Sequence, residues 1–197
     1  MYTMTLRNGL LMTLIVLLTG CGINTIPELD ERAKAGWAQV ENQYQRRADL
    51  VPNLVATVKG YAEQEREVLI AVTEARAKVG QIQVDESTVN DPAKLQAFEQ
   101  AQSELGGALS RLMVVVEQYP DLKSNQNFLT LQSQLEGTEN RISVARKDYI
   151  EAVQAYNTEL RTFPGRIWHS ILYSDLSNRA TFEATTEGAD EAPKVEF

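Results

Sequence analysis

The chain has 197 residues, 43% of them hydrophobic, and its 27 Asp and Glu residues against 19 Lys and Arg give a formal net charge of −8. Because nucleic acid and anionic lipid surfaces repel an acidic protein, neither is expected as a partner on the strength of overall charge. The length predicts one domain, and a single cysteine excludes an internal disulfide.

The N-terminal segment has the features of a bacterial lipoprotein signal. Arg7 precedes an apolar run from Leu10 to Leu18, which is shorter than the roughly 20 residues that span a bilayer but typical of a signal peptide. The stretch Leu18-Thr19-Gly20-Cys21 resembles the lipobox, in which the chain is cut before the cysteine and the cysteine is acylated. We therefore predict a signal peptide over residues 1–20, a covalent lipid on Cys21 and a tether over residues 21–27. The alternative is an uncleaved anchor with an incidental cysteine.

The residue after the cysteine predicts the destination. Gly22 stands there instead of an aspartate, which by the usual sorting pattern favours the periplasmic face of the outer membrane over the outer face of the cytoplasmic membrane. A lipid on Cys21 leaves no thiol for chemistry. We predict no cofactor besides that lipid.

Apolar residues recur at alternating intervals of four and three along three long runs, which begin at Ala33, Leu95 and Phe128. Such spacing keeps one side of a helix facing its neighbours, as in coiled coils and antiparallel bundles. Strand-like alternation is absent, so the fold class is all-α. We predict an antiparallel four-helix bundle with long, coiled-coil-like helices over roughly 28–48, 50–79, 92–119 and 124–162, within a bundle domain of residues 28–182.

The segment that contains Arg46, Arg47, Asp49 and Pro52 interrupts the first run. Proline inside a helix costs about 3 kcal/mol, and Asp49 can cap a new helix, so we predict a joint near Pro52. The alternative is one continuous, bent helix. Arg46, Arg47 and Asp49 are candidate ligand or partner contacts, since arginine binds carboxylate or phosphate bidentately. The favoured alternative is that Arg47 extends into solvent while Arg46 and Asp49 lie in water or cap helix ends.

Polar residues interrupt each run. Counting residues from the predicted turns places Glu65, Gln102 and Thr138 near one level of the bundle, with Arg141 available to pair with Glu65. We predict that these four residues form a buried polar layer. Such layers can fix the register of packed helices.

Two features follow the third run. Residues 164–173 predict a short amphipathic helix that caps the bundle. The alternative is that this helix touches a membrane or a partner. No metal site is predicted, because His169 in this helix has no cysteine or second histidine beside it to complete a set of ligands. Residues 183–197 predict a disordered acidic tail. It ends with alternating apolar residues, of which Val195 and Phe197 are candidate partner contacts; the alternative is a plain spacer.

Three blocks resemble the LemA family: "VENQYQRRADLVPNLVATVKGYAEQE", "YPDLKSNQNFLTLQSQLEGTENRISVARKDYIEAVQAYNTELRTFPG" and "APKVEF". The resemblance implies an antiparallel four-helix bundle tethered to a membrane at its N-terminus. Many members have a spanning helix there, so the lipobox is a departure. The family has no established catalytic residues. Its gene neighbourhoods imply an envelope membrane protein as partner, of the TPM-domain or metallopeptidase type.

Together these features predict a function at a membrane. We expect a non-enzymatic, membrane-anchored scaffold or adaptor lipoprotein of the bacterial envelope, which does not bind nucleic acid. The alternative is an envelope hydrolase or transferase with a cleft at the Arg46–Pro52 joint. Neither prediction names a substrate, because the sequence offers no nucleophile with an adjacent base and no glycine-rich phosphate loop.

Overall fold

The computed structural model describes residues 22–82 and 85–182, so the predicted signal peptide, Cys21 and the acidic tail lie outside the described residues. All regular elements in these ranges are helices, which confirms the all-α fold class. Of the predicted tether, residues 25–27 are already helical. The helices are α2 (Thr25–Lys59), α3 (Arg66–Gln81), α4 (Glu86–Asn90), α5 (Pro92–Val116), α6 (Pro120–Lys123), α7 (Gln126–Glu159) and α8 (Gly165–Leu172).

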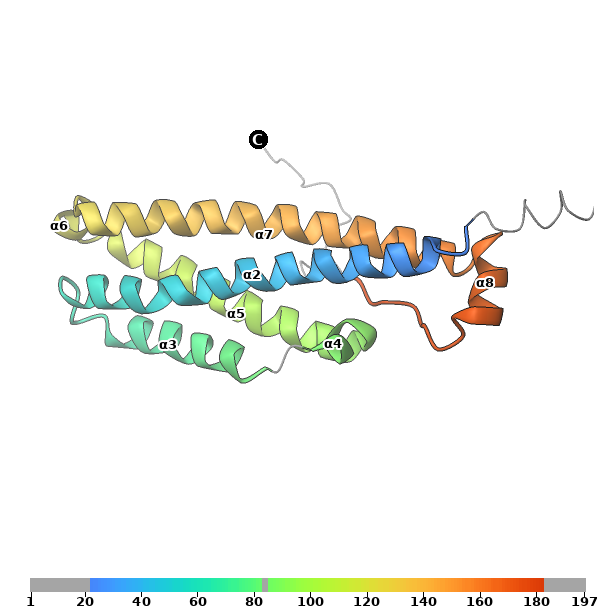
Figure 1. Ribbon diagram of the computed structural model, residues 1–197. Coiled ribbons are helices and arrows are strands. Elements are labelled where there is room, and N and C mark those ends of the chain that lie inside the picture. The colour runs from blue at the N-terminus through green and yellow to red at the C-terminus, as the bar shows by residue number, and fades with distance from the viewer. Residues whose placement is uncertain (1–21, 83–84, 183–197) are drawn as a thin grey trace, which may run out of the picture.

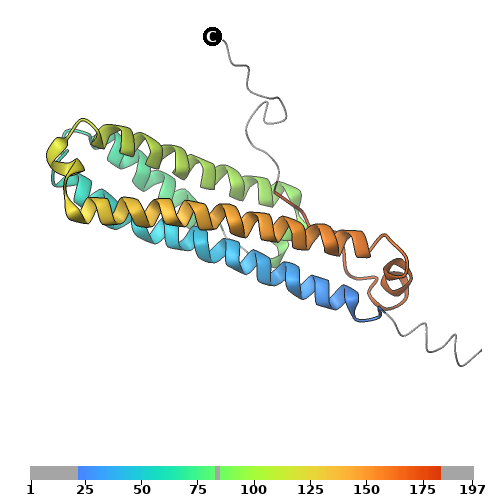
Figure 2. The same cartoon turned by 90° about the horizontal axis from the view of Figure 1, so that it is seen from above.

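Two helical pairs build the bundle. The long helices α2 and α7 run antiparallel along each other, and the shorter pair α3 and α5 packs beside them (Figures 1 and 2). With 35 and 34 residues, α2 and α7 are each about 50 Å long. They approach closely at Gly36, where a Cβ atom would lie 3.3 Å from the Cα of Tyr149. The turn after α2 and the short α6 lie at one end, and α8 lies at the other (Figure 1).

The core is mainly aliphatic near α6 and rich in aromatic rings in the middle. Near α6 it consists mainly of Val, Leu and Ala side chains. In the middle, neighbouring rings have centroids 5.3 to 5.9 Å apart in tilted, stacked or edge-on arrangements, which favours aromatic pairs beyond the burial of their area. The rings belong to Trp37, Tyr44, Phe98, Tyr149 and Phe182.

The predicted joint near Pro52 is wrong, because α2 continues through the proline. Proline cannot donate the helical hydrogen bond to the carbonyl four residues earlier, here that of Ala48. The side chain of Arg76, on α3, supplies the missing donor: its Nε donates to the Ala48 carbonyl at 2.9 Å. Asp49 does not cap a helix there but accepts a hydrogen bond from Gln45 Nε2 at 2.8 Å.

The first hairpin therefore turns later than predicted. α2 ends at Lys59, Gly60 occupies its C-terminal cap, and α3 begins at Arg66. The predicted boundaries 28–48 and 50–79 are replaced by 25–59 and 66–81. A four-helix bundle still results, because the missing joint and the new turn leave the number of long helices unchanged.

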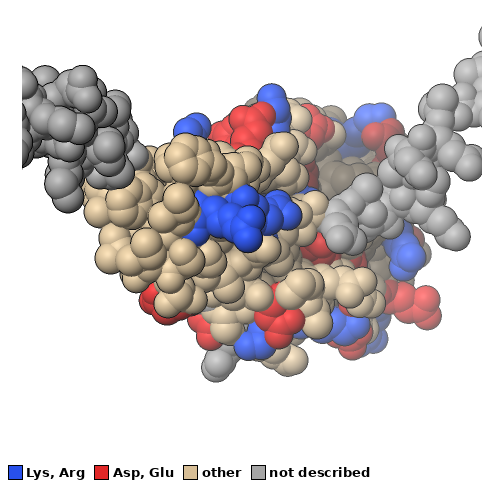
Figure 3. Space-filling view, turned by 90° about the vertical axis from the view of Figure 1, so that its right-hand side faces the viewer, with Lys and Arg blue, Asp and Glu red and all other residues tan. Residues whose placement is uncertain are grey.

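A short helix and an extended segment complete the bundle. A Cβ atom at Gly165 would clash with the backbone carbonyl of Glu159, so glycine is required where the chain turns from α7 into α8. Figure 3 looks onto this end of the molecule. Residues 173–182, which we call the return segment, then run back along the bundle (Figure 1), where Tyr149 Oη donates to Ala180 O at 3.0 Å and Phe182 is buried.

Candidate functional site

Arg47 lies in the middle of α2 and faces the interior, with 4% of its surface exposed. Its Nη2 donates to the backbone oxygen and to the side-chain Oε1 of Gln102 on α5, at 2.8 and 2.6 Å. Its Nη1 donates to both carboxylate oxygens of Glu139 on α7, at 3.1 and 3.3 Å. We call Arg47, Gln102 and Glu139 the central polar cluster. It connects three helices.

The sequence places Arg47 inward because it occupies a position of the apolar run, between Tyr44 and Val51. A buried charge is tolerated only when it is paired and hydrogen-bonded. Glu139 provides the opposite charge from a half-exposed position, and the guanidinium carbon also lies 5.0 Å from the centroid of the Tyr44 ring, within cation–π range. Arg47 is therefore held by both polar and aromatic neighbours.

The three candidate contact residues of this segment are not brought together. Arg46 and Asp49 are exposed, whereas Arg47 is buried and directed to α5 and α7. Of the favoured alternative, the placement of Arg46 and Asp49 in water agrees with their exposure, whereas the extension of Arg47 into solvent is wrong. Because α2 does not break at Pro52, the joint at which the cleft was predicted does not exist.

The predicted polar layer is only partly assembled. Gln102 and Thr138 are buried. Thr138 Oγ1 accepts from Arg141 Nη2 at 3.1 Å, and Arg141 Nε donates to Gln43 Oε1 at 3.2 Å. This contact lies beside the central polar cluster, because Thr138 precedes Glu139 on α7.

Glu65 does not belong to that layer. It lies in the turn before α3 and accepts a hydrogen bond from Tyr119 Oη at 2.9 Å. α2 continues beyond Arg47 to Lys59, a separation of about 18 Å along the axis, so Glu65 belongs to the end of the bundle. The predicted level was wrong because the count assumed an unbroken helix through Glu65. Arg141 therefore pairs with Gln43 and Thr138 instead of Glu65.

Two further charged pairs bridge elements, and sequence reasoning missed both. Arg146 on α7 binds Glu99 on α5 at 2.8 Å and covers the Phe182 ring at 4.3 Å. Asp30 on α2 accepts from Arg179 of the return segment at 2.8 and 3.1 Å. Burial by itself would raise the pKa of Asp30, but hydrogen bonds from Arg179 and Lys34 outweigh it and lower that pKa below its ordinary value.

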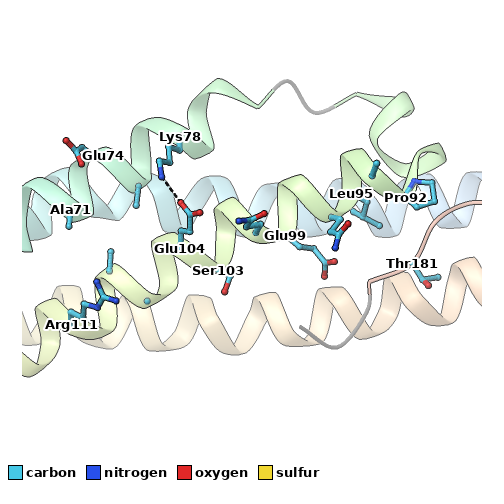
Figure 4. A pocket seen from close by; sticks show the side chains of 16 residues that line it. Ala71, Glu74, Lys78, Pro92, Leu95, Glu99, Ser103, Glu104, Arg111 and Thr181 are labelled. Atoms are coloured by element: carbon cyan, nitrogen blue, oxygen red, sulfur yellow. Dashed lines mark hydrogen bonds and ion pairs between the residues drawn. The ribbon is translucent and has the colours of Figure 1, made fainter. Parts of the chain in front are cut away.

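Two grooves follow the shorter helical pair. The groove between α3 and α5 is lined by small side chains such as Ala71 and Ala75, and Lys78 faces Glu104 across it at 2.9 Å (Figure 4). The groove between α5 and α7 contains Arg47 and Arg146. Because each of these arginines has a carboxylate partner, this groove holds balanced charges and is poorly suited to an anionic ligand.

The described residues offer no metal centre and no bilayer-spanning helix. No three His, Cys, Asp or Glu side chains in this part of the chain gather closely enough to hold a metal ion. His169 Nε2 lies 2.9 Å from the carbonyl oxygen of Leu176. Among the helices described, none combines the length and the apolar character needed to cross a membrane. The predicted lipid site Cys21 and the candidate contacts Val195 and Phe197 lie outside the described residues.

Comparison with known proteins identifies relatives. The model of the LemA family matches residues 36–197. Magnetosome protein MamQ 2 of Paramagnetospirillum magneticum is 27% identical over 175 residues, which cover 81% of this chain and 63% of MamQ 2. Protein LemA of Metamycoplasma hominis is 28% identical over 142 residues, which cover 71% of this chain and 58% of that protein. The chain thus spans about three fifths of the length of the curated relatives it matches.

Proposed function

Because the chain belongs to the LemA family, we propose that it is a non-enzymatic helical scaffold or adaptor, anchored to a membrane of the bacterial envelope. A lipid on Cys21 is the anchor. The periplasmic face of the outer membrane is the favoured site, and the outer face of the cytoplasmic membrane is the alternative. The partner is an envelope membrane protein, of the TPM-domain or metallopeptidase type that the family resemblance implies.

The observation that carries this proposal is how Arg47 is used. Arg47 borders the groove between α5 and α7, but both Nη atoms of its guanidinium are already bound by Gln102 and Glu139. Asp30 with Arg179 and Glu99 with Arg146 follow the same rule. The interior charges therefore hold helices together, as expected of a rigid structural element.

The shape supports the same role. Gly22 lies at the α8 end of the bundle, where a Cβ atom built on it would lie 3.5 Å from Pro164 Cγ, and it directly follows Cys21 in the sequence. α2 and α7 extend from there for about 50 Å. We call the elongated bundle the rod. A chain anchored at Cys21 would hold the α8 end of the rod at the membrane and would keep the turn after α2 away from the anchor.

Anchoring is tested first. Cells are labelled with a clickable fatty acid and fractionated, and the wild type is compared with Cys21→Ser. We expect label and membrane association in the wild type and neither in the variant. Equal labelling of the two proteins would exclude a lipid on Cys21.

The adaptor role is tested by a photoreactive amino acid at exposed apolar positions along the rod, namely Ile70, Val114 and Val144, which are 51%, 66% and 60% exposed. We expect at least one position to crosslink a discrete envelope membrane protein in cells. The same protein should not be captured when the photoreactive residue replaces buried Val72. Absence of a position-dependent crosslink at all three sites would exclude an adaptor that uses the bundle surface.

A further inference from the structure

Four exposed apolar side chains gather at one end of the molecule. Phe163, Ile167, Ile171 and Leu172 are 83%, 45%, 66% and 49% exposed, and they account for four of the nine large apolar side chains that are exposed among the described residues. We call them the α8 face. Ile167 and Ile171 are four residues apart within α8, so they lie on one side of that helix. Phe163 lies in the turn directly before it.

The charge around the α8 face differs from that of the whole chain. Residues 160–174 contain two arginines, Arg161 and Arg166, and neither Asp nor Glu, whereas Glu159 and Asp175 stand directly on either side of this stretch. Local charge is therefore balanced, although acidic residues outnumber basic ones overall. Both arginines are exposed. The end view shows mostly uncharged surface, with a basic group near its centre and acidic groups toward its margin (Figure 3). An exposed apolar patch with adjacent arginines is typical of a helix that lies in the interface of an anionic membrane.

The orientation of α8 is fixed by the bundle. On its inner side, Trp168 packs against the core formed by Ile26, Tyr156 and Leu160, and so does Tyr173, which directly follows the helix. Tyr173 Oη also donates to the carbonyl of Ile23 at 3.1 Å. These contacts hold the inner side, so the apolar side chains of the α8 face point away from the bundle.

The same contacts place α8 beside the start of the described chain. A Cβ atom built on Gly22 would lie 3.5 Å from Pro164 Cγ and 3.9 Å from Trp168 Nε1. Thr25 N donates to Gly22 O at 3.1 Å, and α2 begins at Thr25. Little chain is therefore available as a flexible spacer between Cys21 and α8.

We propose that the α8 face inserts into the interfacial layer of the anionic bilayer that holds the N-terminus. This inference rests on the proposed anchoring through Cys21. The apolar side chains enter the boundary between headgroups and acyl chains, while Arg161 and Arg166 meet lipid phosphates. With a second contact beside the lipid, the rod is held at a fixed angle to the membrane and cannot swing freely around one anchor.

The test uses the full-length lipoprotein in vesicles of phosphatidylethanolamine and phosphatidylglycerol. Acylation consumes the only native thiol, so an introduced cysteine can carry an environment-sensitive fluorophore. The probe is placed at Ile171→Cys and, as a matched control, at Ile70→Cys, which replaces another exposed isoleucine (66% and 51% exposed) near the opposite end. Quenching by spin-labelled lipids is measured for both positions.

We expect a blue-shifted emission and strong lipid quenching at position 171 and neither at position 70. In a second variant, Phe163→Asp with Ile167→Asp, quenching at position 171 should fall severalfold while the circular dichroism spectrum stays unchanged, because both side chains are exposed. If the protein floats with the vesicles but position 171 is quenched no more than position 70, membrane insertion of α8 is excluded. The same conclusion follows if the emission at position 171 is blue-shifted but is not quenched by spin-labelled lipid, because protein and not lipid then surrounds the probe. If the protein does not float with the vesicles, the proposed anchoring fails as well.

Discussion

Arg47 illustrates how one buried charge can be interpreted in two ways. A sequence shows only that an arginine occupies a core position, which fits a ligand site or an internal ion pair equally well. The structure decides for the internal pair, because Gln102 and Glu139 approach from two other helices. Glu139 lies next to Thr138, a buried position of the third run. The position of Glu139 directly after a buried residue of the third run was the sequence feature that could have indicated it as the partner of Arg47.

Replacement of Arg47 tests whether the central polar cluster stabilises the fold. Arg47→Ala leaves the side chain of Gln102 without its partner in the interior, so we expect the free energy of unfolding to fall by about 2 kcal/mol. Arg46→Ala is the control, because Arg46 is exposed, and should change stability by less than about 0.5 kcal/mol. Urea denaturation followed by circular dichroism measures both. Equal effects of the two variants would contradict a structural role for Arg47.

Asp30 makes the stability of the fold depend on pH. Asp30 and Arg179 are 5% and 6% exposed, so Asp30→Asn removes the carboxylate that binds the buried Arg179 guanidinium and should cost about 3 kcal/mol at pH 7. The folded state lowers the pKa of Asp30 below its ordinary 3.8. The carboxylate therefore contributes its full stability above that value and loses it as pH falls through the folded pKa. The gap in melting temperature between wild type and Asp30→Asn should close under acid; a gap that is constant from pH 7 to pH 3 would contradict this assignment.

At the scale of elements, local pattern predicted the helices well and the place of the first turn poorly. The apolar runs extend through α2, α5 and α7, because burial of one side of a helix is recorded in the sequence of that helix alone. The fate of Pro52 depends on Arg76, which lies on the next helix. A contact between distant residues is invisible to local propensity, so the proline indicated a break that its environment removes.

A double-mutant cycle isolates this contact. Arg76→Ala leaves the Ala48 carbonyl unpaired and should reduce stability by about 1 kcal/mol. In a Pro52→Ala background, the new backbone N–H can donate a hydrogen bond to the same Ala48 carbonyl. The loss of stability caused by Arg76→Ala should therefore shrink by at least half. Thermal unfolding of the four proteins gives the coupling. Strict additivity would show that Arg76 does not compensate for the proline.

The return segment is the element that sequence patterns indicated least, because it has no regular structure. Phe182 is 7% exposed and packs against Trp37 and Tyr149, so Phe182→Ala should lower stability by about 3 kcal/mol. Phe163, which is 83% exposed, provides the matched control: Phe163→Ala should change stability by less than about 0.5 kcal/mol. Differential scanning calorimetry compares the two variants. A small effect at Phe182 would mean that the segment only rests on the bundle.

At the scale of the whole molecule, the fold could be predicted from the sequence, but the pairing of the polar side chains in its interior could not. Gln102 and Thr138 are marked as buried polar positions by the run in which each lies, but the pairs Asp30–Arg179 and Glu99–Arg146 join residues from separate elements. Such pairs depend on the relative rotation and register of helices. Periodicity within one helix carries no information about either quantity.

Two regions are candidates for binding the envelope partner protein: the bundle surface and residues 183–197. A shortened chain distinguishes between them. A chain that ends at Phe182 keeps every core residue that the structure describes, so we expect its helical signal and melting temperature to match those of the full chain. If Val195 and Phe197 contact the partner, the shortened chain should lose the envelope protein that the full chain crosslinks. Phe197→Asp should reproduce that loss, since a charge cannot enter an apolar pocket without a large desolvation cost. Equal crosslinking by all three proteins would assign binding to the bundle surface and leave residues 183–197 as a spacer.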